Sequence, residues 1–168
     1  SHYPQSRHFI SECDRLGLLV FTEIPGWQHI GDKEWKEKAI INTKEMVLQY
    51  RNHPSVIIWG VRINESQDDD EFYKKTNETA HALDPTRPTS GVRYIENSSL
   101  LEDIYSYNDF SHTGNNSGVK EKRKVTKHQD KPLLVSEANG HMFPTKAFDS
   151  WERRQEHALR HARVINDA

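Results

Sequence analysis

The feature that most constrains this chain is a series of short apolar runs, separated from one another by stretches with helical periodicity. The runs at residues 17–24, 55–63 and 132–136 are nearly continuous in apolar side chains. Strands that are apolar on both faces belong in buried parallel sheets. Weaker runs lie at residues 88–92 and 103–107. The pattern predicts an α/β fold with a parallel sheet of about five strands.

Helical patterns fill the intervals between these runs. Ser6 and Asp32 occupy N-cap positions before the first two, and two further helices are expected at residues 68–83 and 151–165. An open doubly wound sheet and part of a closed barrel both fit this alternation. The sequence contains no Gly-rich phosphate loop, which weakens a nucleotide-binding interpretation.

Charge and composition argue against several classes of partner. Lys and Arg number 23 against 25 Asp and Glu, so there is no basic excess to attract nucleic acid. No apolar run approaches the roughly 18–20 residues of a membrane span. The single cysteine, Cys13, is expected to fill a helix core. We expect neither a nucleic-acid nor a membrane partner, and neither a metal nor another cofactor.

The N-terminal residues do not resemble a natural start. They contain no Met and no signal-peptide pattern. We therefore expect the chain to be a piece of a longer protein. Its localisation stays unknown, because the parent could be cytoplasmic, periplasmic or secreted.

Two acidic residues directly follow the strongest predicted strands. Glu65 follows the run at residues 55–63 after Asn64, and Glu137 follows the run at residues 132–136. Reacting groups gather at the carboxyl edge of parallel sheets. Two carboxylates there suit glycoside hydrolysis, with carboxyl groups about 5–5.5 Å apart in a retaining enzyme. Taken alone, either Glu could equally be a loop residue at the surface. Asn64 could be a turn residue or could bind a sugar hydroxyl.

The sequence of these segments resembles glycoside hydrolase family 2, which includes β-galactosidases, β-glucuronidases and β-mannosidases. Residues 52–59 read NHPSVIIW and are followed by Asn64 and Glu65, as in the acid/base segment of that family. Residues 132–137 read PLLVSE and resemble its nucleophile segment. The resemblance runs over nearly the whole chain. It implies that residues 1–168 are a single partial catalytic domain of a (β/α)8 TIM barrel, holding about strands 3 to 7.

The resemblance also implies roles for individual residues. Glu65 would be the general acid/base and Glu137 the nucleophile. The other groups expected near the substrate are His2, Asn64, Tyr107, Asn108, His141 and Trp27. Trp27 stands where some β-galactosidases carry a metal-ligating Glu. A Trp cannot ligate a hard cation, so no such metal is expected, and Trp27 would either form a stacking wall for a sugar ring or pack under a turn.

The chain departs from the family in one place. Trp59 and Glu65 are separated by one residue more than in the common family pattern. Arg62 or Ile63 is therefore an insertion, which we interpret as a bulge that re-aims Glu65. Arg62 would then point into the site or out to a salt bridge.

The leading hypothesis is a retaining β-glycosidase, with β-galactosidase as the first choice of specificity. The alternatives are β-glucuronidase or β-mannosidase, a catalytically silent carbohydrate-binding or structural fragment, and an unrelated α/β protein that uses Glu65 and Glu137 as metal ligands. An incomplete barrel exposes sheet edges and apolar faces. We therefore expect the isolated chain to be marginally stable or to associate with itself, and to be a poor catalyst.

Overall fold

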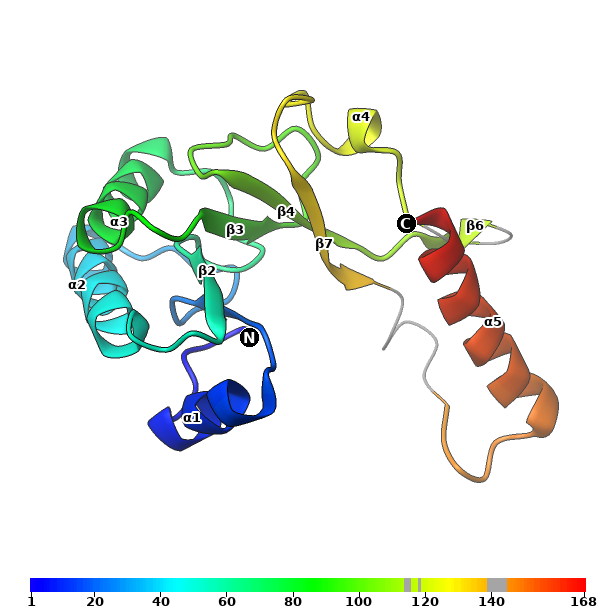
Figure 1. The fold of residues 1–168 in the computed structure, drawn as a ribbon. Helices are drawn as coiled ribbons and strands as arrows, with labels where there is room; N and C mark the ends of the chain where they lie inside the picture. The colour runs from blue at the N-terminus through cyan, green and yellow to red at the C-terminus, as the bar shows by residue number, and fades with distance from the viewer. Residues whose placement is uncertain (114–115, 118, 139–144) are drawn as a thin grey trace.

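A computed structural model describes residues 1–113, 116–117, 119–138 and 145–168 (Figure 1). One parallel sheet dominates it, and its strands occur in the order β1-β2-β3-β4-β7. Their bounds are β1 (Val20–Glu23), β2 (Val56–Gly60), β3 (Thr89–Arg93), β4 (Ile104–Asp109) and β7 (Leu133–Ala138). Each lies within or beside one of the five apolar runs, so the predicted parallel sheet is confirmed. A short antiparallel pair, β5 (His112–Thr113) and β6 (Asn116–Ser117), was not expected.

The expected helices are present with their expected caps. Their bounds are α1 (Arg7–Leu16), α2 (Lys33–Tyr50), α3 (Asp70–Leu83), α4 (Lys122–Val125) and α5 (Trp151–Asp167). The side chain of Ser6 accepts a hydrogen bond from Phe9 N, and that of Asp32 accepts one from Trp35 N. These bonds satisfy amide groups that a helix leaves unpaired at its start. Within the described part of the chain, no helix has the length and apolar character needed to cross a membrane.

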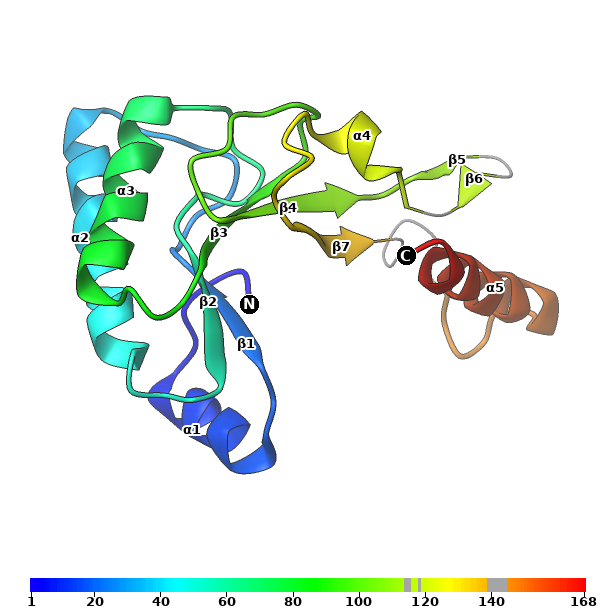
Figure 2. The same cartoon turned by 45° about the horizontal axis from the view of Figure 1, so that its top comes forward.

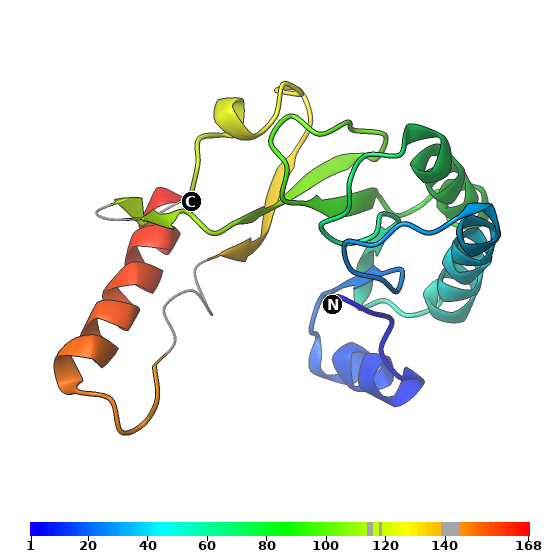
Figure 3. The same ribbon diagram turned by 180° about the vertical axis from the view of Figure 1, so that it is seen from behind.

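The sheet is part of a barrel rather than a doubly wound sheet. Its strands follow one another in space in the same order as along the chain, and the sheet curves as it proceeds (Figure 3). The crossovers from β1 to β2 and from β2 to β3 run through α2 and α3. The choice that periodicity left open is thus resolved in favour of a partial barrel of five parallel strands.

The main hydrophobic core lies between the first two strands and the first three helices. Figure 2 shows α2 and α3 side by side against the sheet. Trp59 of β2 is fully buried at the centre of this core, and its Nε1 donates a hydrogen bond of 3.1 Å to Asp84. Cys13 is buried in the same core, as expected for a helical cysteine. A second, smaller core joins Tyr105, Tyr107 and Val125.

The amino-terminal end of β2 is tied to α1 by polar contacts. Asp14 accepts a hydrogen bond of 2.9 Å from Ser55 N, and its other oxygen lies 2.6 Å from Nδ1 of His53. These contacts lie at the end of β2 remote from Glu65. His53 therefore connects structural elements.

The last helix, α5, differs from the others in how little of it is buried. None of the residues of α5 is buried, and Leu159 and Ile165 are exposed. In Figures 1 and 2 this helix lies beyond β7, apart from α2 and α3. The apolar stripe that predicts this helix is thus not covered by the described residues.

Gly60 is required by the close approach of β1 and β2. A Cβ atom at this position would lie 2.3 Å from Cγ of Glu23 and 2.7 Å from its Cα. We expect Gly60→Ala to lower the free energy of unfolding by about 1–3 kcal/mol, as overpacking does. Urea denaturation measures this loss.

A second variant tests whether Glu23 is the neighbour responsible. In Gly60→Ala/Glu23→Ala the Cγ contact is absent, so the two losses should not add. Strict additivity of the two single variants, or an unchanged stability of Gly60→Ala, would contradict the packing described here.

Candidate active site

The segment after β2 leaves the regular ladder before it reaches Glu65. Val61 N donates to Ser90 O (2.9 Å), and regular parallel pairing would place residue 63 on Val92 O. Instead Glu65 N, two residues later, donates to Val92 O at 3.0 Å. The expected bulge after Trp59 is present, and it involves two additional residues rather than one.

The bulge ends in a tight turn with Glu65 at its third position. Ser66 N donates to Ile63 O at 3.2 Å, and Glu65 has a φ of 54°. A positive φ at that position is usual for Gly or Asn and uncommon for other residues. Such a conformation costs about 1–3 kcal/mol and persists where the surroundings enforce it.

The carboxylate of Glu65 accepts three hydrogen bonds from neutral side chains. Trp27 Nε1 and Gln28 Nε2 donate to Oε2 at 2.9 and 3.3 Å, and Asn108 Nδ2 donates to Oε1 at 3.0 Å. Partial burial raises the pKa of Glu65, but these hydrogen bonds outweigh it and hold the pKa below its ordinary value. Glu65 is therefore ionised at neutral pH in this state.

Glu137 reaches the same edge from β7. The register between β4 and β7 shifts after Tyr107, so that Glu137 lies opposite Asn108. Ser136 Oγ donates to Oδ1 of Asn108 at 2.9 Å. The amide of Asn108 thus contacts Glu65 through its nitrogen and the strand of Glu137 through its oxygen.

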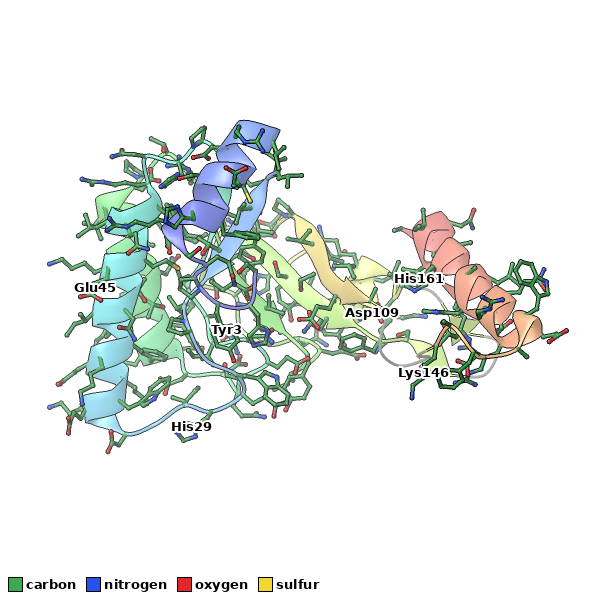
Figure 4. The ribbon with its side chains drawn as sticks, turned by 90° about the horizontal axis from the view of Figure 1, so that it is seen from below. Tyr3, His29, Glu45, Asp109, Lys146 and His161 are labelled. Atoms are coloured by element: carbon green, nitrogen blue, oxygen red, sulfur yellow. The ribbon has the colours of Figure 1, made fainter. Side chains whose placement is uncertain are left out.

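Both carboxylates line one cavity of about 250 Å³. The remaining residues of its lining are His2, Trp27, Asn64 and Phe110. Asn64 is buried, and its Nδ2 lies 3.2 Å from Nδ1 of His2. Figure 4 labels one residue on each of three segments near these residues in the chain: Tyr3 on the N-terminal segment, His29 after β1 and Asp109 at the end of β4.

The structure brings together most of the residues expected near a substrate. His2, Asn64 and Trp27 line the cavity, and Asn108 contacts Glu65. Trp27 is 56% exposed and its Nε1 is hydrogen-bonded to Glu65, so it does not pack under the turn at Gly26.

One of the expected residues, Tyr107, is not brought to this cavity. Tyr107 is buried with Tyr105 and Val125 in the smaller core and does not line the cavity with the two carboxylates. Since successive side chains of a strand point to opposite faces, Tyr107 and its neighbour Asn108 cannot both face the cavity. His141 lies outside the described residues.

Sequence reasoning missed Gln28, Phe110 and, above all, Glu23. Glu23 ends β1, is 5% exposed, and lines a second hollow together with Glu137. Burial raises its pKa to about 7; the amine of Ser1 opposes this rise and the charge of Glu137 adds to it. Glu23 has the same strand-end position that identified Glu65 and Glu137, so the signal was present in the sequence. No cluster of three or more His, Cys, Asp or Glu side chains among the described residues is arranged to hold a metal ion.

Comparison with known proteins agrees with this geometry. Residues 1–159 match the model of glycosyl hydrolases family 2, TIM barrel domain. A β-galactosidase of Thermoanaerobacterium thermosulfurigenes is 60% identical over 99% of this chain, which covers 23% of that protein. A β-galactosidase of Thermoanaerobacter pseudethanolicus is 52% identical over 98% of the chain and 21% of that protein. The chain therefore spans less than a quarter of the length of these relatives.

Solved structures share the fold over the whole chain. The β-D-glucuronidase of Dictyoglomus thermophilum aligns with a TM-score of 0.80 at 23% identity, covering 100% of this chain and 35% of that one. A family 2 β-galacturonidase from Eisenbergiella tayi, bound to galacturonate, aligns with a TM-score of 0.77 at 23% identity over 99% of this chain and 34% of that one. At this identity the likeness establishes the partial TIM barrel alone.

The buried carboxyl of Glu23 makes stability depend on pH. Because its pKa is raised from 4.5 to about 7, its contribution to stability is complete below pH 4.5 and is lost as the pH rises through 7. The loss amounts to roughly 3 kcal/mol. Glu23→Gln has no charge to bury and should not show this loss. Urea unfolding at pH 5 and pH 8 measures the difference.

Glu12→Gln is the matched control, because it neutralises an exposed carboxylate on α1. It should leave the pH dependence of stability as in the wild type. Equal pH slopes for the wild type and Glu23→Gln would show that Glu23 ionises freely in the folded state.

Proposed function

The chain belongs to glycoside hydrolase family 2, and from that premise we propose that it forms the central part of the catalytic barrel of a retaining β-glycosidase, with β-galactosidase as its specificity. The observation that carries the proposal is that Glu65 and Glu137 line one cavity, although they lie far apart in the chain. Two carboxylates on opposite sides of a glycosidic bond are what the double-displacement reaction needs.

In the first step, a carboxylate oxygen of Glu137 attacks the anomeric carbon while the bond to the leaving oxygen breaks. Glu65 gives its proton to that oxygen, and a covalent glycosyl-enzyme forms. In the second step, Glu65 takes a proton from water as the water oxygen attacks the same carbon. The bond to Glu137 breaks, and the sugar leaves with its original configuration.

The general acid must hold a proton, whereas Glu65 is ionised in the ligand-free state. A sugar in the cavity completes the burial of Glu65 and competes for its donors Trp27 and Gln28, and both changes raise its pKa. Once Glu137 is esterified its negative charge is gone, so the pKa of Glu65 falls again and suits a base.

The remaining cavity residues have matching roles in this proposal. The exposed ring of Trp27 offers a face on which a sugar ring can stack. Asn64 Oδ1 is buried and has no hydrogen-bond partner among the described residues, so it can accept a bond from a sugar hydroxyl. Asn108 holds Glu65, and His2 holds the amide of Asn64. These are the groups we assign to substrate binding and orientation.

The charge of the cavity supports a neutral sugar. Among the described residues that line it there is no Lys or Arg, whereas there are two Glu side chains. A glucuronide would bring a third carboxylate close to Glu65 and Glu137 without a permanent cation to balance it. This favours a galactoside over a glucuronide, the specificity of more distant relatives such as the rat enzyme, which is 28% identical over 67% of this chain and 20% of that protein.

Trapping of the glycosyl-enzyme tests the proposal. The full-length enzyme is incubated with 2-deoxy-2-fluoro-β-galactosyl fluoride, and the adduct is located by peptide mass spectrometry. We expect label on Glu137, because the fluorine at C2 slows both steps, whereas the reactive fluoride leaving group keeps formation of the ester faster than its hydrolysis. Glu137→Gln should carry no label, whereas Glu121→Gln, which neutralises an exposed carboxylate remote from the cavity, should be labelled as the wild type is. Active enzyme without label at Glu137 would contradict the assignment.

We further propose that the 168-residue chain associates with itself when it is studied alone. No described strand covers the outer edges of β1 and β7. Leu19, beside β1, is 72% exposed and Leu18 is 54% exposed. Unpaired edges with apolar side chains favour association.

Sedimentation velocity over a range of concentrations should show the chain forming larger species as its concentration rises. Leu19→Lys should shift this distribution toward the monomer, because a charge at a sheet edge opposes pairing. A stable monomer at high concentration would contradict the proposal.

A further inference from the structure

Arg62, which lies in the bulge before Glu65, is a buried cation outside the cavity. Its side chain is 1% exposed, so it takes the second of its two expected directions, away from the substrate. Nη2 donates to Asp68 Oδ1 at 2.5 Å and to Ser66 O at 3.4 Å. The guanidinium lies over the ring of Tyr73 on α3, 4.6 Å from its centroid.

The contacts of Arg62 fasten the turn on both sides of Glu65. Arg62 precedes Glu65 by three residues and binds the carbonyl of Ser66, which follows it. The hydroxyl of Ser66 is in turn bonded to the hydroxyl of Tyr73 at 2.5 Å. Both ends of the turn are thus attached to the same aromatic ring of α3.

Asp68 extends these contacts to the segment after β3. Ser98 Oγ donates to Oδ1 of Asp68, and Ser99 N donates to Oδ2 at 3.0 Å. Together with Arg62 these hydrogen bonds hold the pKa of Asp68 below its ordinary value, although burial opposes them. The ion pair is therefore intact at neutral pH.

The neighbouring strand leaves room for this arrangement. A Cβ atom on Gly91 of β3 would lie 2.3 Å from Cβ of Arg62 and 2.9 Å from its Cδ. Only a glycine at this position lets the Arg62 side chain cross the strand.

Stability alone does not account for this ion pair, in which the side chain of Arg62 is 1% exposed and that of Asp68 is 39% exposed. Replacing a buried charge and its partner with apolar groups is often neutral or stabilising, and the best-attested use of buried charges is to select one conformation. The conformation at stake here is that of Glu65, whose φ of 54° needs enforcement by its surroundings.

We propose that Arg62, with Asp68 and Tyr73, is a positioning element that locks the turn of Glu65 so that its carboxyl is aimed at the leaving oxygen. This inference rests on the proposed function of Glu65 as the general acid. It assigns a role to one of the residues in the bulge by which the chain departs from the common family pattern.

The test compares two β-galactosides in the full-length enzyme, one with an alkyl leaving group and one with a 2,4-dinitrophenyl leaving group. Cleavage of the alkyl galactoside needs proton donation from Glu65, whereas cleavage of the dinitrophenyl galactoside does not. Arg62→Met should lower kcat/KM for the alkyl galactoside about 10²-fold, the loss typical of a misplacement of about 1 Å. It should leave kcat/KM for the dinitrophenyl galactoside within about threefold of the wild type.

Arg93→Met is the matched control. Arg93 is also 1% exposed, lies over Tyr105 at 4.7 Å and pairs with Glu102, and its side-chain hydrogen bonds to the described residues go to Gly91, Ser99 and Glu102 rather than to the turn of Glu65. Arg93→Met should change kcat/KM for both galactosides by the same factor. Equal losses on both substrates in Arg62→Met would show a merely structural role and overturn the inference.

Two further variants keep the test decisive if Arg62→Met does not fold. Asp68→Asn preserves the size of the side chain, and Tyr73→Phe removes only the hydroxyl that binds Ser66. Both should show the same selective loss on the alkyl galactoside, and equal losses on both substrates would again overturn the inference. Glu65→Gln separates the two hypotheses. If only Glu65→Gln loses kcat/KM selectively on the alkyl galactoside, the positioning role is refuted and the proposed function of Glu65 stands. If Glu65→Gln shows no such selective loss, the proposed function of Glu65 is refuted.

Discussion

The parallel alignment of the strands is the constraint on which the site depends. Because β1, β2, β3, β4 and β7 all run in one direction, their carboxyl ends meet at one edge of the sheet. That edge collects Trp27, Glu65, Asn108 and Glu137 from four different segments. Each backbone ladder fixes the position of the next strand end, so a register slip in any ladder between β2 and β7 would separate the two carboxylates.

The sequence predicts the parts of this arrangement that depend on local pattern. Continuous apolar runs mark the strands, and an acid directly after such a run marks Glu65 and Glu137. The conformation of Glu65 could not be predicted, since its positive φ is enforced by Arg62 and by α3, which follows it in the chain. The core position of Tyr107 follows from strand alternation beside Asn108, a local rule that the family resemblance obscured.

The site is supported by charges as well as by an apolar core. Around β1 and β2 the layer between sheet and helices is hydrophobic, with Trp59 at its centre. Behind β3 the same layer contains two buried arginines, each above a tyrosine ring and each paired with an acid. A hydrophobic contact tolerates sliding, whereas an ion pair with defined hydrogen bonds selects one geometry. This layer changes from hydrophobic packing to ion pairs beside the turn that carries Glu65.

Three carboxyl groups at one edge of the sheet cannot all be charged without an energetic cost. Their surroundings favour different protonation states for Glu23 and Glu65. Burial raises the pKa of Glu23 to about 7, so that below this pH its carboxyl is mostly protonated and Glu137 has no charged neighbour there. Glu65 is the opposite case, because three neutral donors lower its pKa in the free enzyme. Two of these donors, Trp27 and Gln28, lie on the loop after β1, whereas Asn108 is fixed by Ser136. In the proposed mechanism, a sugar bound against that loop therefore changes the protonation of Glu65, whereas Asn108 keeps the carboxylate in place.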